Sequence, residues 1–381
     1  MKKALAILLA MLMMLSMLTA CAGQDTANAP AKTDDSVNSA DTSADKPADN
    51  SEANADLEAI TVSVHPSGHG LPAYVAEQLG YYTEEGLDVT TRVYIGAPPQ
   101  MEAYEAGAWD IGTTGFGGIV LGVAKSTLKV VGVTIDDGLV MGLWARSDSD
   151  LANAGYNEET GCYGTADDWR GKEILYTQGT ITDIMLTATL EKLGLTADEV
   201  VRTNMDSSPA FTAFKAGSGD MVQANSAFYF NAQNEGWVPV TTGTSQNIYM
   251  PSVIVASDKI IESNPEVVEK WVRAYMKGVE WIKANPEEAA KMFVEFCDEN
   301  GVATDETNAL DFVNAQVINI PGVDEQLSYF ATAEDGNGTV LQEALAHCMN
   351  TYVSMGNYTQ QDADALMLDE NYDSSFMEKL K

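Results

Sequence analysis

The sequence predicts an α/β protein of two lobes, and three observations carry this prediction. Short β-branched segments alternate with amphipathic helices over residues 57–245, as in βα units. Residues 246–381 begin with one strand and then become helical, which indicates that the chain returns to its first lobe. The whole stretch is also long for one compact core. We place the first lobe in residues 57–146 and 246–381, and the second lobe in residues 147–245.

The strands are expected, in chain order, over Ile60–Val64, Leu87–Tyr94, Trp109–Thr113, Lys129–Val133, Met141–Arg146, Glu173–Thr177, Val200–Asn204, Gly219–Gln223, Trp237–Thr241 and Pro251–Ser257. Helices are expected after the turns that follow most of these strands, and then at Asp305–Ile318 and Val340–Met355. Asn264-Pro265 and Asn285-Pro286 each combine a capping side chain with a favoured first helical residue, so each predicts a helix start. Residues 147–168 are polar and acidic and are expected to form a long loop or insertion.

The best-marked βα unit is Lys172–Gly194. It predicts a strand, a tight turn at Gly179 and a helix over Thr180–Leu193 with apolar residues at helical spacing. The first backbone N–H groups of such a helix lack partners within the helix and can hold an acceptor group of a ligand. An ordinary structural βα unit would look the same, so this stretch alone leaves both interpretations open.

The N-terminus has the pattern of an export signal. Two lysines precede an apolar run that ends in small residues before Cys21, and this arrangement resembles a bacterial lipobox. We expect a signal peptide at residues 1–20, lipidation of Cys21 and a disordered spacer to residue 56, because residues 22–56 contain no aromatic side chain. The alternative is a chance cysteine after a plain signal. The protein is then expected on the extracytoplasmic side, lipid-anchored to the bacterial cell membrane.

The net charge of -35 argues against nucleic-acid partners and against adhesion to an anionic bilayer. Membrane contact is therefore expected through the N-terminal lipid only. The four cysteines show no metal-ligand spacing, and no nucleotide-binding glycine motif is present, so we expect no metal and no cofactor. Cys297 and Cys348 both fall in predicted C-terminal helices and could form a disulfide, although free thiols are an equal alternative.

Four stretches resemble one known family: Ala73–Val89, Asp168–Thr180, Phe214–Asp220 and Asn264–Ala290. Their order and spacing are similar to those of nitrate/sulfonate/taurine-type solute-binding proteins, which are related to binders of thiamine-pyrimidine precursors. The resemblance implies a class II periplasmic-binding-protein fold with a hinge and an interlobe ligand cleft. It also implies a monomer that captures a small polar organic solute, taurine/sulfonate-like or pyrimidine-type, and delivers it to an ABC permease and its ATPase.

Two departures from the family pattern bear on the solute. Asn225-Ser226-Ala227 stands where members often carry an aromatic and an acidic residue before proline, and the 147–168 segment is longer than usual. The candidate ligand-binding residues are those at the family's pocket positions together with Asp136, which follows a predicted strand: Ser67, Gly68, His69, Thr113, Thr114, Gly115, Asp136, Gly179, Thr180, Asn225 and Ser226.

Two other functions remain open. An enzyme of the same fold, of the pyrimidine-synthesising type, would need a cysteine-rich metal motif or a nucleophile–base pair, which the sequence does not show. A surface lipoprotein that acts as a sensor without transport would share the export signal.

The loops predicted to face the cleft contain no lysine or arginine, but they include Asp136, Asp137, Asp183 and Asp206. These loops are His65–Pro72, Ile95–Gln100, Thr113–Gly118, Thr134–Gly138, Thr177–Asp183, Asn204–Pro209 and Ala224–Phe230. An anionic solute there would have to rely on helix N-termini and hydroxyl groups alone. This charge pattern favours a neutral, zwitterionic or cationic solute over nitrate or a simple sulfonate.

Overall fold

The computed structural model describes residues 57–178, 181–302, 304–334, 336–354 and 356–381. The expected signal peptide, the lipidation site Cys21, the spacer and the turn residues Gly179 and Thr180 lie outside the described residues. Among the residues that the structure describes, no helix has the length and apolar character needed to cross a membrane.

A five-stranded sheet forms one half of the strand framework, in the order β2-β1-β3-β12-β4. Its strands are β1 (Glu58–Val64), β2 (Leu87–Val93), β3 (Ile111–Thr114), β4 (Leu128–Asp136) and β12 (Pro251–Ser257). β1, β2 and β3 pair in parallel, whereas β12 runs antiparallel to both β3 and β4. Every residue of β12 is buried, as a central strand with both faces covered requires.

A seven-stranded sheet, in the order β6-β7-β11-β5-β10-β8-β9, forms the other half. Its strands are β5 (Met141–Ala145), β6 (Tyr156–Asn157), β7 (Cys162–Tyr163), β8 (Glu173–Tyr176), β9 (Val201–Asn204), β10 (Met221–Asn225) and β11 (Val238–Thr242). β5 was expected in the first lobe but belongs to this second sheet. The lobe boundaries at residues 146 and 245 stay a prediction.

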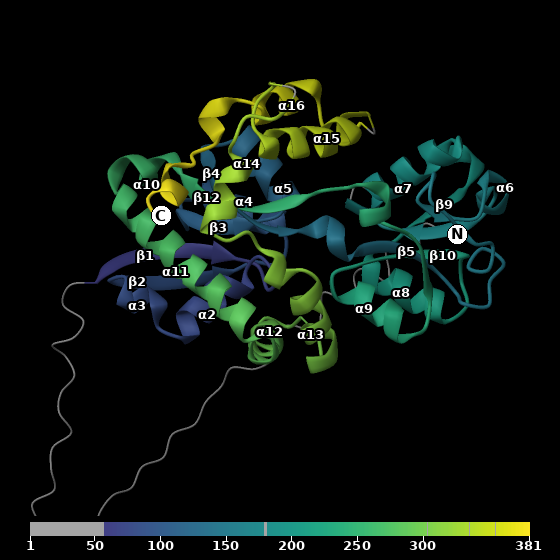
Figure 1. Ribbon diagram of the computed structural model, residues 1–381, viewed down its shortest axis with the longest axis horizontal. Helices are drawn as coiled ribbons and strands as arrows, with labels where there is room; N and C mark the ends of the chain where they lie inside the picture. Colours follow the sequence, from purple (N-terminus) through teal and green to yellow (C-terminus); the bar gives the residue numbers. More distant parts are fainter. Residues whose placement is uncertain (1–56, 179–180, 303, 335, 355) are drawn as a thin grey trace, which may run out of the picture. The chain divides into compact units, whose positions relative to one another are not determined.

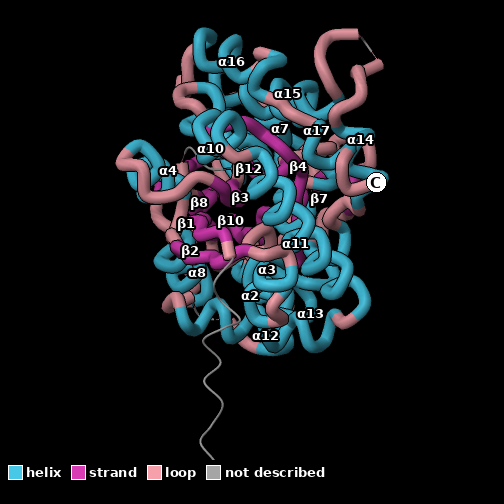
Figure 2. The backbone as a smooth tube through the Cα atoms, turned by 90° about the vertical axis from the view of Figure 1, so that its left-hand side faces the viewer, coloured by secondary structure: helices cyan, strands magenta, loops and turns pink. Residues whose placement is uncertain are grey.

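Helices lie on both faces of the five-stranded sheet (Figures 1 and 2). The layer drawn below the sheet contains α2 (Leu71–Gln78), α3 (Tyr81–Glu84), α11 (Pro265–Ala284), α12 (Pro286–Glu299) and α13 (Glu306–Ala315). The layer above it contains α14 (Val323–Tyr329), α15 (Val340–Ser354) and α16 (Gln360–Leu366). The C-terminal segment of the chain therefore covers a face of the first sheet.

The other helices are shorter or flank the second sheet. They are α4 (Ala97–Glu105), α5 (Phe116–Gly118), α6 (Ala166–Trp169), α7 (Ile181–Leu193), α8 (Ser207–Lys215), α9 (Ala227–Asn234), α10 (Asp258–Ser263) and α17 (Ser375–Glu378). A π-helix at Ile119–Ala124 continues α5 where an α-helix was expected. With two mixed sheets and helices on their faces, the predicted α/β class is confirmed.

Residues 147–168 are the main correction to the predicted elements. They were expected to form a long loop or insertion, and they contain the antiparallel pair β6 and β7 and most of the helix α6. β7 pairs with β11 through Cys162 and Thr241, so this segment extends the edge of the second sheet. Two-residue strands carry too little alternation of polar and apolar residues to be recognised from sequence.

The helix starts at Pro265 and Pro286 are confirmed, but the predicted asparagine caps are wrong. The Asn264 side chain donates instead to Glu58 Oε1 at 3.2 Å. The Asn285 side chain donates to the Trp281 carbonyl of the preceding helix at 2.9 Å. The prolines thus begin these helices without a side-chain cap.

The three described cysteines are free and buried, so the suggested pairing of Cys297 with Cys348 is wrong. Cys297 lies in the core cluster that contains α11 and α12, whereas Cys348 lies in the cluster around β4, β12 and α15.

α11 anchors the layer below the first sheet. Its apolar stripe, including Trp271, Tyr275 and Val279, is buried as the sequence predicted. Gly278 allows a close approach to α2, because a Cβ atom there would lie 2.3 Å from the Pro72 carbonyl oxygen. The Tyr275 hydroxyl donates to the His69 carbonyl at 2.9 Å, which ties the loop before α2 to this helix.

We predict that Gly278→Ala destabilises the protein by about 1–3 kcal/mol, because backbone atoms must separate to admit the new methyl group. Alanine favours the helix over glycine by about 1 kcal/mol, and this gain stabilises the variant. A measured loss of stability would therefore have to exceed that gain. Urea unfolding measures the effect, with the exposed Glu280→Ala on the same helix as control. A variant as stable as the parent would contradict the close helix contact.

Candidate functional site

The chain passes from the first sheet to the second after β4 and returns to the first sheet before β12. These two passages between the sheets meet at Asp136. The chain leaves β4 at this residue and reaches β5 through the 3₁₀ helix Asp137–Val140. One Asp136 carboxylate oxygen accepts hydrogen bonds from the Gly138 N–H at 2.8 Å and from the Met250 N–H at 2.9 Å. Because Met250 immediately precedes β12, the carboxylate joins the outgoing and the returning passage.

Glycine is required next to this junction. A Cβ atom at Gly138 would lie 2.2 Å from the Ile248 carbonyl oxygen of the returning passage. The Asp137 N–H also donates to the Met250 carbonyl at 2.9 Å. The two passages therefore touch through backbone atoms, and the position of Asp137 is set by both.

The hydrogen-bond partners of the Asp137 carboxylate among the described residues are neutral side chains. Ser252 Oγ donates to its Oδ2 at 2.8 Å, and Gln316 Nε2 lies 3.4 Å from its Oδ1. Burial raises the pKa of this carboxyl to about 6, and the neighbouring charge of Asp136 acts in the same direction. At neutral pH, Asp137 is thus an ionised, half-buried group without a cationic partner in the described chain.

Asp137 faces a pocket of about 240 Å³. The pocket is lined by residues from α5, the passage between sheets, the start of α7, the residue before β12, α15 and the segment between α15 and α16: Phe116, Gly117, Asp137, Ile181, Met250, Tyr352 and Tyr358. No lysine or arginine is among these lining residues.

Three aromatic rings form one wall of this pocket. Phe116 stacks on Tyr352 with a centroid separation of 5.3 Å, and Tyr352 meets Tyr358 edge-on at 5.6 Å. Lys125 lies 5.4 Å from the centre of the Tyr358 ring, but its ammonium group pairs with Asp362 at 3.1 Å. Together the rings and Asp137 form a pocket that is aromatic on one side and acidic on another.

The histidines of the first loop belong to a buried hydrogen-bond network. His65 Nε2 and Gln100 Oε1 are 2.9 Å apart, and His69 Nδ1 and Thr113 Oγ1 are 2.9 Å apart. Since the Gln100 amide nitrogen donates to Ser63 and to the Thr113 carbonyl, its oxygen accepts and His65 donates. Burial lowers the pKa of His65 to about 4 and that of His69 well below its usual value. Neither ring offers a positive charge near neutral pH.

Among the predicted site residues, Thr113 and Thr114 end β3, and Gly115 follows them. Both threonines are buried, and Thr114 Oγ1 donates to Gln100 Oε1 at 2.8 Å, so their hydroxyls are used inside the protein. A Cβ atom at Gly115 would lie 3.6 Å from Asp137 Oδ2, which places its backbone beside the carboxylate.

Other predicted residues gather at a second, smaller pocket of about 110 Å³. Ser67 and Ser226 line it together with apolar side chains of α12 and α13, including Phe293 and Phe312. Ser67 Oγ is buried without a hydrogen-bond partner among the described residues. Ser226 has a positive φ of 49° at the start of α9, which few side chains adopt.

Gly68 and Asp136 lie near these pockets without lining them. A Cβ atom at Gly68 would meet Gln316 Oε1 at 3.0 Å and Phe312 at 3.1 Å. Asn225 ends β10, where it pairs with Met141. Gly179 and Thr180, which precede the pocket residue Ile181, lie outside the described residues. The ligand-binding roles of all these residues stay predictions.

None of the seven residues that line this pocket is among the predicted ligand-binding residues, although Asp137 was predicted to lie in a cleft loop. Among the missed residues are the three aromatic ones, Phe116, Tyr352 and Tyr358. Phe116 directly follows the predicted turn and could have been added by proximity. The tyrosines lie on and after α15, more than two hundred residues further along the chain, and no local pattern connects them with β3.

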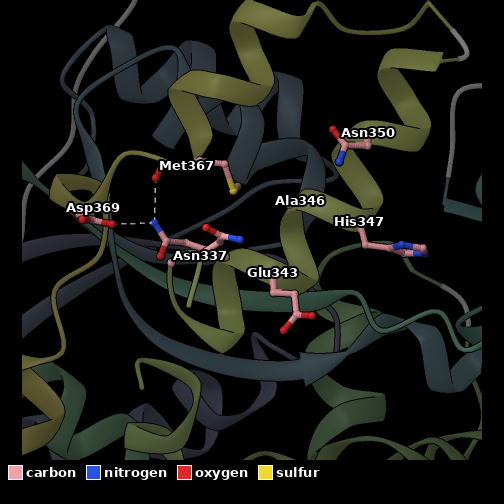
Figure 3. Close-up of a pocket in the computed structure, with 9 residues that line it drawn as sticks. Asn337, Glu343, Ala346, His347, Asn350, Met367 and Asp369 are labelled. Carbon is pink, nitrogen blue, oxygen red and sulfur yellow. Dashed lines mark hydrogen bonds between the residues drawn. The ribbon is translucent and has the colours of Figure 1, made fainter. Parts of the chain in front are cut away.

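A larger pocket of about 580 Å³ lies on the C-terminal helices (Figure 3). Its lining comes only from residues 337–369, with Glu343, His347 and Asn350 along α15. Gln342 Nε2 donates to the Met367 carbonyl at 2.9 Å and lies 3.3 Å from Asp369 Oδ1. Because it collects no residue from either passage between the sheets, we place the candidate site at the Asp137 pocket.

Comparison with known proteins agrees with this architecture. A putative binding protein of Brucella abortus is 25% identical over 255 residues, which cover 65% of this chain and 74% of that protein. A putative ABC transporter periplasmic binding protein of Brachyspira hyodysenteriae is 22% identical over 329 residues, covering 86% and 91% of the two chains.

The crystal structure of the periplasmic aliphatic sulphonate binding protein SsuA from Escherichia coli matches with a TM-score of 0.65. The match has 16% identity and covers 82% of this chain and 92% of that one, so it confirms the predicted periplasmic-binding-protein fold. A family model described as NMT1/THI5 like matches residues 69–289, more than half of the chain. The chain belongs to the NMT1/THI5-like family.

Proposed function

We propose that this protein captures a small polar organic solute in the Asp137 pocket and delivers it to an ABC importer on the extracytoplasmic side of the membrane. The observation that carries the proposal is the position of the pocket. Asp137 stands on the passage from β4 to β5, Met250 precedes β12, and Ile181 begins α7 on the second sheet. A pocket built from both passages is suited to couple solute binding to a movement between the two sheets.

The size of the pocket supports a metabolite-sized solute. Its volume of about 240 Å³ is below the roughly 300–1,000 Å³ that is usual for drug-sized ligands. The relatives are named binding proteins, and the importer role rests on the Brachyspira hyodysenteriae relative in particular. The sulphonate in the name of the SsuA structure is a property of that protein and does not set the solute here.

The described residues give little support to an enzyme of the same fold. They contain no group of three or more histidine, cysteine, aspartate or glutamate residues placed to hold a metal ion. Burial raises the pKa of Cys297 and of Cys348 to about 12, which disfavours the nucleophilic thiolate. A binding protein needs neither group, and the relatives carry binding-protein names.

A solute screen tests the proposal. We expect at least one small solute to raise the unfolding temperature, since a ligand at 100 times its dissociation constant stabilises by about 2.7 kcal/mol. Tyr358→Ala, which removes part of the pocket wall, should weaken that ligand in calorimetry, whereas Tyr156→Ala on the exposed strand β6 should not. Stimulation of the cognate importer ATPase by the loaded protein separates transport from sensing. Equal binding by both variants would exclude this pocket.

Lobe closure around the solute gives a second prediction. The radius of gyration from small-angle scattering should fall when the identified solute saturates the parent protein, because hinge closure brings the two sheets together. Tyr358→Ala at the same solute concentration should scatter like the empty protein. A radius that does not change at saturation would remove the hinge from the proposal.

Lipid attachment at Cys21 is part of the proposed function and gives a third prediction. Cys21→Ala should leave the protein uncleaved or released, whereas the parent should partition into detergent as a processed species. Metabolic labelling with a fatty-acid probe measures the attachment directly, and Cys162→Ala, a buried cysteine on β7 near the edge of the second sheet, is the matched control. Lipid labelling that persists in Cys21→Ala would contradict the anchor.

A further inference from the structure

The Asp137 pocket carries a negative charge that the described chain does not neutralise. Its Oδ2 accepts from Ser252, and its Oδ1 faces the neutral amide of Gln316. An ionised carboxylate that is partly removed from water loses solvation, and a cation close to it restores much of that loss. The position therefore suits a ligand that brings its own positive charge.

The surroundings extend this negative character. Asp136 lies next in the chain, and its carboxylate is already used by the Gly138 and Met250 amides. Burial raises the pKa of the Tyr352 hydroxyl, and the nearby charge of Asp183 adds to the shift. The first-loop histidines are neutral, as described above. An anionic head group would thus meet the Asp137 carboxylate without a cationic side chain in the pocket lining to balance it.

The aromatic wall is the second, independent feature. The faces of phenylalanine and tyrosine attract cations, and the attraction grows as the site becomes drier. Phe116, Tyr352 and Tyr358 present three rings to the same pocket as the carboxylate. Lys125 is the described cation beside one of these rings, and Asp362 already neutralises it.

We propose that the Asp137 pocket selects a small organic cation, a protonated amine whose N–H groups donate to Asp137 and whose charge lies against Phe116, Tyr352 and Tyr358. This inference rests on the proposed function, since it names the solute class of the same pocket. It separates this chain from a sulphonate binder, because a sulphonate would carry the wrong charge for Asp137. Two of the three rings, Tyr352 on α15 and Tyr358 after it, lie outside the residues that match the family model.

Matched probes of opposite charge test the charge preference. We would titrate n-butylammonium against n-butanoate and propane-1-sulfonate by calorimetry at pH 7.5, with choline as a cation that has no N–H donor and taurine as an amine that also carries a sulfonate. We expect n-butylammonium to bind at least tenfold more tightly than either anion and more tightly than choline or taurine. Asp137→Asn should weaken that amine at least tenfold, whereas the exposed Asp88→Asn on β2 should leave it unchanged.

The pH response of the same variant supplies a control for folding. A carboxyl with a raised pKa destabilises the folded state above that pKa, and the penalty disappears as the pH falls and the group takes up its proton. Asp137→Asn should therefore raise the unfolding temperature of the empty protein at pH 7.5, and the difference should shrink toward pH 5. A variant that is more stable but binds less tightly has lost recognition, not structure.

Amine binding by the parent protein should weaken about tenfold from pH 7.5 to pH 5, where about nine-tenths of a carboxyl with a pKa near 6 is protonated. The titratable groups around Asp137 are Asp136 next to it in the chain and Tyr352 and Tyr358 in the same pocket. Tyr249 and Cys348 lie close enough to Asp136 for its charge to raise their pKa values. The Asp137→Asn comparison isolates Asp137 from all of them.

Three outcomes would overturn the inference: tighter binding of an anion, amine binding that Asp137→Asn leaves unchanged, or no binding of any amine at millimolar concentration. In each case solute capture is judged separately. If the wider screen finds an anion or a neutral solute that Tyr358→Ala weakens, the proposed function stands and only the cation preference falls. If the screen finds no ligand, the proposed function falls as well.

Discussion

One buried carboxylate fixes the arrangement on which the candidate site depends. Asp136 accepts two backbone N–H groups from different passages between the sheets, and so holds the end of β4 beside the start of β12. Removing it would leave two amides without partners, at a cost of about 1–3 kcal/mol for each buried group. The next residue, Asp137, is thereby directed into the pocket. Asp136 thus has a structural role, and it lies next to the aspartate that we propose as the solute-binding residue.

Much of the fold could be predicted from the sequence, and the reasons lie in particular elements. β12 and α11 were predicted because β12 is a continuous apolar run and α11 has an apolar stripe at helical spacing. β6 and β7 could not be, since their two-residue strands exist only through pairing with β11 and with each other. The same holds for Asn264. Its side chain was expected to cap α11, but it donates a hydrogen bond to Glu58, which lies far away in the sequence. Long-range pairing overrode local preference in each case.

The site was harder to predict than the fold, because its residues are brought together by tertiary contacts. The acidic character of the cleft was visible in the sequence, but nothing local distinguishes Asp136, bound by amides, from Asp137, which faces the pocket. His69 was expected to line the cleft, yet it lies buried against Thr113. Tyr352 reaches the pocket only because the C-terminal helices fold back over the first sheet (Figure 1). Residue type could be read from the sequence, whereas side-chain direction could not.

The three buried thiols have a practical consequence for observing this protein. At neutral pH, a thiol with a pKa of about 12 is ionised in only about one molecule in 100,000, so Cys297 and Cys348 react slowly while the structure is intact. They lie in separate core clusters, one beneath α11 and one under the C-terminal helices. Labelling rates at the two sulfurs would therefore report separately on the transient opening of each core cluster. No additional cysteine would have to be introduced.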